Sequence, residues 1–217
     1  PYGQGTVCHM VHFIMRKIFS QSLKWLIALS LLPILLKPAA AEPLPGLLHH
    51  WNFDEGPDWH DDPFGAISTA SLAEDAVGDL DWTFDQLDGS AWVSGRQYSG
   101  LLLDGIDGTL VTQGDLGSVL GGDASLSFWL RTTQVGEDNP LRAPGLLGSS
   151  EIQWAWLDAS GRIGVAVDEM PVARSAQAIN DNKWHHVVLS RNSTSGEVMV
   201  WVDGIQVASA TGPSGTR

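Results

Sequence analysis

The sequence predicts an all-β domain, because short apolar runs follow one another along the chain with Gly, Asp, Asn and Ser between them. No stretch after residue 42 keeps the apolar period of a helix. The runs that qualify as strands are 47–53, 90–94, 100–105, 108–112, 125–132, 145–149, 152–158, 162–168, 184–192, 197–204 and 205–210. Many short strands joined by tight turns predict a β-sandwich or a β-barrel.

Two local patterns strengthen this assignment near the C-terminal end. Asp203-Gly204 lies between two alternating runs and predicts a type I′ hairpin. Alternation in 197–203 places Val198, Val200 and Val202 on one face of a strand, and Met199, Trp201 and Asp203 on the other. The segment 54–89 is rich in Asp and Gly, so we expect a long loop with one short strand or helical turn.

The beginning of the chain predicts a secretory signal peptide over residues 15–41. A basic stretch (15–24) precedes an apolar stretch (25–36), and the small residues 39–41 predict cleavage near Ala41. The apolar stretch is too short for a bilayer-spanning helix, which takes about 20 residues. We therefore expect three parts: an upstream, non-native segment 1–14 outside the fold, the signal peptide 15–41, and one exported domain 42–217, either extracellular or periplasmic.

The charge of the chain limits its partners. The 12 Lys and Arg residues stand against 25 Asp and Glu residues, a net charge of −13. Loss of the signal peptide would remove four basic residues and no acidic residue, which leaves 8 against 25, or −17. Such acidity excludes nucleic acid and anionic membrane as expected partners. Cys8, the sole cysteine, precedes the signal peptide, so the exported domain has no disulfide.

Five motifs in order carry a resemblance to a known family. They are 51-WNFDEG-56, 91-AWVSGRQYSGLLLDGIDGTLV-111, 125-SLSFWLRT-132, 183-KWHHVVLSRN-192 and 199-MVWVDGIQVA-208. Together they resemble the laminin G-like, concanavalin A-like lectin/glucanase domain, in its bacterial secreted branch. The resemblance implies an antiparallel two-sheet β-sandwich of jelly-roll topology.

Two departures from the family pattern affect what we expect. Leu103 stands where the family usually has Phe. Family members also continue beyond the Val-Asp-Gly hairpin into a closing strand that pairs beside the first strand. We therefore expect a domain truncated at the C-terminus, with its last strands missing and an unpaired edge beside the first strand.

Four acidic residues are candidate ligands of a structural Ca²⁺, which some members of the family hold near the first strand. They are Asp54, Asp62, Asp104 and Asp107. Ca²⁺ prefers carboxylate and carbonyl oxygens from flexible loops. The alternative is that these residues only form turns or lie in solvent. His60 among acids in 58–62 is a lesser candidate for a mixed metal site.

Trp59, Trp82 and Trp201 are the candidate carbohydrate-binding residues, because sugar rings stack on exposed aromatic faces. Packing of these rings into the domain is the alternative. Other tryptophans occupy motif positions that we expect in the core, namely Trp51, Trp92, Trp129 and Trp184.

Catalysis is not expected. A glycoside hydrolase needs two carboxylates about 5–10 Å apart, and hydrolases of this fold typically carry Glu-x-Asp-x-x-Glu on one strand. No such motif occurs, and 74-EDAVGD-79 has the wrong order. The predicted function is a non-catalytic, secreted recognition or adhesion domain that binds a glycan, with Ca²⁺ as a structural ion. The alternatives are a structural or protein-interaction module that binds an extracellular protein, and an accessory domain of a glycoside hydrolase.

His185 and His186 are adjacent within a predicted strand, so their side chains point to opposite faces. We expect His186 to be a core or inter-sheet histidine with a backbone hydrogen-bond partner, rather than a ligand. The pair then marks the fold and is not a catalytic site.

Overall fold

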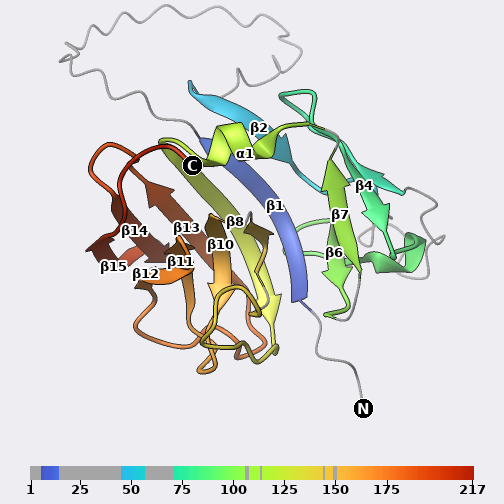
Figure 1. Cartoon of the computed structure of the whole chain (residues 1–217). Coiled ribbons are helices and arrows are strands. Elements are labelled where there is room, and N and C mark those ends of the chain that lie inside the picture. Colours follow the sequence, from blue (N-terminus) through green and yellow to red (C-terminus); the bar gives the residue numbers. More distant parts are fainter. Residues whose placement is uncertain are drawn as a thin grey trace, which may run out of the picture.

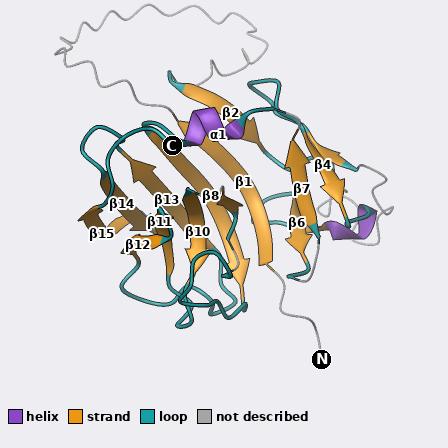
Figure 2. Cartoon of the chain, in the orientation of Figure 1, coloured by secondary structure: helices purple, strands orange, loops and turns teal. Residues whose placement is uncertain are grey.

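The computed structural model describes residues 6–14, 45–56, 71–105, 108–112, 114–143, 145–148 and 151–217 of the chain. These residues form antiparallel sheets, with one short α-helix and one 3₁₀ turn as the helical elements of the described part (Figure 2). The predicted all-β, antiparallel sandwich is thereby confirmed.

An eight-stranded main sheet forms one layer. Its strand order is β15-β14-β13-β8-β1-β6-β5, and β2 also pairs with β1. The bounds are β1 Thr6–Ile14, β2 Leu47–Trp51, β5 Trp92–Ser94, β6 Ser99–Leu103, β8 Ala124–Thr132, β13 His185–Arg191, β14 Glu197–Val202 and β15 Ile205–Thr211.

Two smaller sheets and the helices complete the fold. A second sheet has the order β12-β11-β10-β9, and a third has the order β3-β4-β7. The bounds are β3 Leu72–Ala73, β4 Trp82–Asp85, β7 Thr109–Thr112, β9 Leu147–Gly148, β10 Ile152–Leu157, β11 Ile163–Val167 and β12 Met170–Arg174. The 3₁₀ turn η1 spans Gly89–Ala91, and α1 spans Leu116–Leu120.

The core lies between the main sheet and the second sheet, which crosses in front of it in Figure 1. Burial along β8 alternates strictly, with Leu126, Phe128 and Leu130 inside. Val187 and Leu189 of β13 continue the same inner face. Every residue of β10 is buried. A strand with one buried face, such as β8, alternates between buried and less buried residues, whereas a strand covered on both faces, such as β10, does not.

The predicted hairpin at Asp203-Gly204 is confirmed. Asp203 has φ 53° and Gly204 has φ 80°, and the turn joins Val202 directly to Ile205 in the β14–β15 pairing. Two positive φ angles are the mark of a type I′ turn, whose twist matches that of the flanking strands.

The long-loop expectation for 54–89 is only partly right. Two short strands, β3 and β4, lie within it, while residues 57–70 lie outside the described residues. Trp82 begins β4 and stacks on Trp51 of β2 with 4.5 Å between ring centroids, so a tertiary contact orders this segment. The sequence also gave no sign of β12, because Pro171 interrupts the run. Pro is tolerated there because β12 is an edge strand.

Residues 6–14 differ most from expectation. They form β1, which lies inside the main sheet with β8 on one side and β2 and β6 on the other. The expected unpaired edge beside the first strand is therefore wrong, because β1 pairs with β2. The structure thus places residues 6–14 within the fold, while the expectation that 1–14 is an upstream, non-native segment stays a prediction.

Candidate functional site

The outer face of β8, β13 and β14 is the part of the main sheet that does not point into the core. We call it the β8–β14 face and define it by half-buried residues: Ser125, Ser127, Trp129, His186, Val188, Ser190, Met199 and Trp201. Strand register aligns these residues in rows across the sheet. Ser127 lies opposite Val188, which lies opposite Trp201.

A groove of about 500 Å³ runs along this face. Val188, Met199 and Trp201 give it apolar surface, and Ser190, His186 and Glu197 add polar groups. Ser190 Oγ has no hydrogen-bond partner within the described part of the chain. Binding sites for small polar ligands combine apolar surface with a few placed polar groups in this way.

His186 is fixed on the β8–β14 face by Ser127 and Trp129. Its Nε2 lies 2.9 Å from Ser127 Oγ, and its ring lies 5.1 Å from the Trp129 ring. Arg96 places its guanidinium 4.8 Å from the Trp129 ring centroid, a cation–π contact. Trp129 is therefore held between Arg96 and His186, which leaves Trp201 as the aromatic side chain that lines the groove.

The protonation of His186 suits hydrogen bonding rather than charge. Burial lowers the pKa of His186, and the Asp203 carboxylate offsets this only in part. The imidazole is then neutral at pH 7, with one donor and one acceptor. The expected backbone partner for the ring is wrong, since the ring bonds the Ser127 hydroxyl. The ring also lies on the groove side rather than in the core, because Val187 and Leu189 occupy the inner face.

His185 belongs to a separate cluster at the end of β13. Its Nδ1 lies 2.8 Å from Asp203 Oδ2, and its Nε2 lies 3.1 Å from Asp181 Oδ1. Burial lowers the pKa of His185, but these two carboxylates outweigh it and the net shift is upward. Because the carboxylates bond opposite nitrogens of one ring, the three groups do not converge on a common ion.

Two carboxylates line the groove, which bears on catalysis. Asp123 Oδ1 accepts hydrogen bonds from Ser193 N at 2.6 Å and from Ser193 Oγ at 2.7 Å. These bonds lower the pKa of Asp123. The general acid of a glycoside hydrolase needs the opposite shift. Glu197 accepts from Ser209 Oγ at 3.3 Å. Asp123 is therefore unsuited to protonate a leaving group.

A buried pair that sequence reasoning missed links β2 to the segment 74–81. His49 Nδ1 and Asp75 Oδ2 are 2.6 Å apart, and the side chain of Asp75 is fully buried. Asp75 also accepts backbone hydrogen bonds from His50, Val77, Gly78 and Leu80. Burial would raise the pKa of Asp75, but the hydrogen bonds from these groups outweigh it and lower the pKa to about 2. The carboxylate fastens the segment 74–81 to β2.

The three candidate sugar-binding tryptophans are not brought together. Trp201 is half-buried and lines the groove, and its role in sugar binding stays a prediction. Trp82 is only 4 % exposed and stacks on Trp51, so the expectation of an exposed Trp82 is wrong. Trp59 lies outside the described residues. Among the expected core tryptophans, Trp51 and Trp92 are buried, whereas Trp129 and Trp184 are half-buried.

The candidate calcium ligands are only partly described. Asp54 is exposed and accepts from Asn52 Nδ2, and Asp104 Oδ1 accepts from Gly108 N. Asp62 and Asp107 lie outside the described residues, as does His60. Within the described ranges, no three His, Cys, Asp or Glu side chains form a group that could hold a metal ion. The calcium site stays a prediction.

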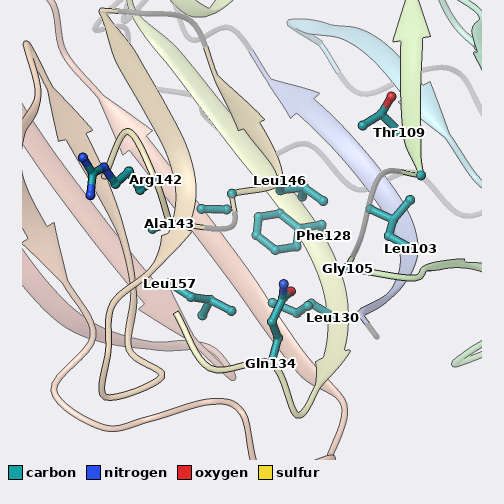
Figure 3. A pocket seen from close by; sticks show the side chains of 13 residues that line it. Leu103, Gly105, Thr109, Phe128, Leu130, Gln134, Arg142, Ala143, Leu146 and Leu157 are labelled. Atoms are coloured by element: carbon teal, nitrogen blue, oxygen red, sulfur yellow. The ribbon is translucent and has the colours of Figure 1, made fainter. Parts of the chain in front are cut away.

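A second cavity, of about 330 Å³, lies between the layers at the opposite end of β8. Figure 3 shows Phe128, Leu130, Leu146 and Leu157 around its interior, with Gln134 at the side. This lining combines aliphatic residues with Thr109, Gln134 and Arg142, and it has no tryptophan. The groove on the β8–β14 face differs from this cavity in having Trp201, on which a sugar ring can stack.

The comparison with protein families agrees with the fold. A laminin G-type family model, described as the concanavalin A-like lectin/glucanases superfamily, matches residues 104–217, just over half of the chain. The chain belongs to this superfamily. The matched region contains β8, β13 and β14 and therefore the whole groove. Neither the search of curated proteins nor the search of solved structures found a match. In the described residues, no helix is long and apolar enough to cross a membrane.

Proposed function

We propose that this superfamily member is an exported, non-catalytic recognition domain that binds a glycan in the groove on the β8–β14 face. The observation that carries the proposal is the position of Trp201, which lines a groove of about 500 Å³ beside Met199, Val188 and Ser190. Aromatic and aliphatic surface binds the apolar faces of sugar rings, and polar side chains bond their hydroxyls.

The proposed location and the proposed class of partner rest on the family and on the sequence. Laminin G-like domains are typically extracellular and bind glycans or proteins. The signal-like segment 15–41 and the acidity of the chain support an extracellular or periplasmic location with an uncharged partner. A structural Ca²⁺ bound through Asp54, Asp62, Asp104 and Asp107 remains part of the proposal.

The lack of catalysis is proposed on chemical grounds. Asp123 is held ionised by Ser193, whereas a hydrolase requires a general acid whose pKa is raised. A protein-binding role on the same face is the alternative, and a glycan screen separates the two.

The test is a glycan array with the labelled full chain, followed by titration of each positive glycan. Trp201→Ala is expected to weaken binding about tenfold or more, because it removes the largest apolar surface of the groove. Tyr98→Ala is the matched control, since Tyr98 is an exposed aromatic (54 %) outside the groove lining. Thermal melts of both variants verify folding.

Three outcomes decide the proposal. Binding lost with Trp201→Ala and kept with Tyr98→Ala supports the groove as the site. Binding kept in both variants refutes that location. An array without any glycan signal refutes glycan binding and favours the protein-interaction alternative.

A further inference from the structure

The groove on the β8–β14 face has an acidic end. Asp123 immediately precedes β8, Glu197 begins β14, and both residues line the groove. β13 lies between these two strands (Figure 1), and Asn192 and Ser193 follow its last residue. Asn192 N donates to Glu197 O at 2.8 Å, and Ser193 N donates to Asp123 Oδ1 at 2.6 Å. Two steps between neighbouring strands, about 10 Å, therefore separate the two acids.

Each of the two carboxylates keeps one oxygen for a ligand. Both hydrogen bonds from Ser193 go to Asp123 Oδ1, and the hydrogen bond from Ser209 goes to Glu197 Oε1. Among the described residues, no hydrogen bond or ion pair reaches Asp123 Oδ2 or Glu197 Oε2. An ionised carboxylate accepts about four hydrogen bonds, so both groups have room for a cationic donor.

Arg191 does not balance the negative charge of this end. It is the one Arg or Lys among the described residues that line the groove, but it is only 3 % exposed. Its guanidinium donates to the backbone carbonyls of residues 121, 122, 213 and 215. The hydrogen bonds from Ser193 are the main cause of the lowered pKa of Asp123, and the charge of Arg191 makes the smallest contribution. The groove therefore presents negative charge to its ligand.

Trp201 forms the aromatic end of the same groove. It follows Glu197 by four positions in β14, so the two side chains project from one face, about 13 Å apart along the strand. Met199 and Ser190 pair across β14 and β13 between these two ends. A ligand that contacts both Trp201 and Glu197 is therefore longer than a single sugar ring.

We infer that this groove selects glycans that contain positively charged amino sugars, such as oligomers of glucosamine or galactosamine without acetyl groups. One sugar ring stacks on Trp201, and the ammonium groups of further rings bind Asp123 Oδ2 or Glu197 Oε2. An ammonium group has three donors, and hydrogen bonds between ionised groups are stronger than neutral ones. The same carboxylates repel sulfated and uronic-acid glycans. The inference rests on the proposed glycan-binding function and adds the charge of the ligand to it.

The test titrates the full chain with pairs of oligosaccharides, each an amino-sugar oligomer and its neutral counterpart of equal length and linkage. Glucosamine oligomers are paired with glucose oligomers, and galactosamine oligomers with galactose oligomers. An amine beside a C–O bond resembles the α-amino group, whose pKa is about 7.7–8.0, so the amino-sugar probes are charged at about pH 6. We expect the amino-sugar member of a pair to bind at least about fivefold more tightly. Added salt should reduce this preference, because it screens the charges.

Glu197→Gln is the decisive variant, because it removes one charge and keeps both the shape of the side chain and an acceptor for Ser209. It should reduce the preference to about twofold or less without weakening the binding of the neutral oligomers. Glu137→Gln is the matched control. Glu137 is an exposed acid outside the groove lining, so this variant loses the same net charge and should keep the preference. Tetralysine is the control for cation binding as such, since it has no sugar ring to stack on Trp201.

The outcomes separate this inference from the proposed function. A preference for amino sugars that is lost with Glu197→Gln and kept with Glu137→Gln supports the inference. Neutral glycans that bind at least as tightly as the amino-sugar oligomers, or a preference that Glu197→Gln leaves unchanged, overturn it while glycan binding stands. Tetralysine that binds as tightly as the amino-sugar oligomers reveals a site for basic peptides and also overturns it. Absence of binding by every glycan refutes the proposed function and the inference together.

Discussion

Replacement of Asp75 by Asn should destabilise the protein by about 2 kcal/mol at pH 7. The pKa of Asp75 falls from 3.8 to about 2 on folding. At 1.36 kcal/mol for each pKa unit, this difference corresponds to about 2 kcal/mol of stability for the ionised form. Asn keeps the shape of the side chain. The carboxylate of Asp75 now accepts hydrogen bonds from Leu80 N and from His49 Nδ1, which is 2.6 Å away. The amide nitrogen of Asn would place a donor against one of these donors, and that hydrogen bond would be lost.

The pH dependence follows from the sign of this change. Because the folded-state pKa is depressed, the contribution of Asp75 is complete above pH 3.8 and disappears as the pH falls through about 2. The difference in unfolding free energy between the wild type and Asp75→Asn should therefore shrink to about 1 kcal/mol at pH 3.

Urea unfolding followed by tryptophan fluorescence measures this difference between pH 7 and pH 3. Asp79→Asn is the matched control, because Asp79 is an exposed acid in the same segment, and its change should stay within about 0.5 kcal/mol. Equal stability of the two variants at pH 7, or a gap that does not shrink towards pH 3, would refute the reasoning.

Three further predictions use other parts of the molecule. Burial lowers the pKa of His185, but its bonds to Asp203 and Asp181 outweigh burial and raise the pKa. The protonated ring therefore stabilises the fold fully below about pH 6.5. This stability is lost as the pH rises through the raised pKa of the folded state. Urea unfolding of His185→Gln should lack this loss, and an unchanged pH profile would contradict the assignment. Gly164→Ala should lower the free energy of unfolding by about 1–3 kcal/mol, because the new Cβ meets the Ala173 carbonyl of the neighbouring strand β12. Gly122→Ala should be nearly neutral, because its Cβ meets open space. Equal melting temperatures of the two variants would disprove this. If Ca²⁺ binds as proposed, EDTA should lower the melting temperature of the full chain and added Ca²⁺ should restore it, and a melt unaffected by EDTA contradicts the site.

The sequence predicts the two-layer fold because its strands alternate between a core face and an outer face. The alternation within 197–203 places Met199 and Trp201 together, and both line the groove. It does not say which face of a neighbouring strand is buried. For that reason His186 was expected inside, although Val187 and Leu189 of the same strand fill the core.

Features that depend on distant pairing could not be predicted from local patterns. His49 and Asp75 are 26 positions apart, and neither belongs to a recognisable motif. A polar segment predicts an exposed Trp82, yet Trp82 is buried and stacks on Trp51. The role of residues 6–14 was missed for the same reason, since their partners in β6 and β8 come much later in the chain.

The interior position of β1 also has a consequence for the order of synthesis. Thr6 pairs with Thr132, so about 120 residues must be made before the β1–β8 ladder can close. At about 5–20 residues per second, the nascent strand waits roughly 6–24 seconds with its β8-facing edge unpaired. Contacts at such sequence separation also slow folding, because the loop must close before they contribute. We therefore expect this edge to stay open to other contacts until β8 has left the ribosome.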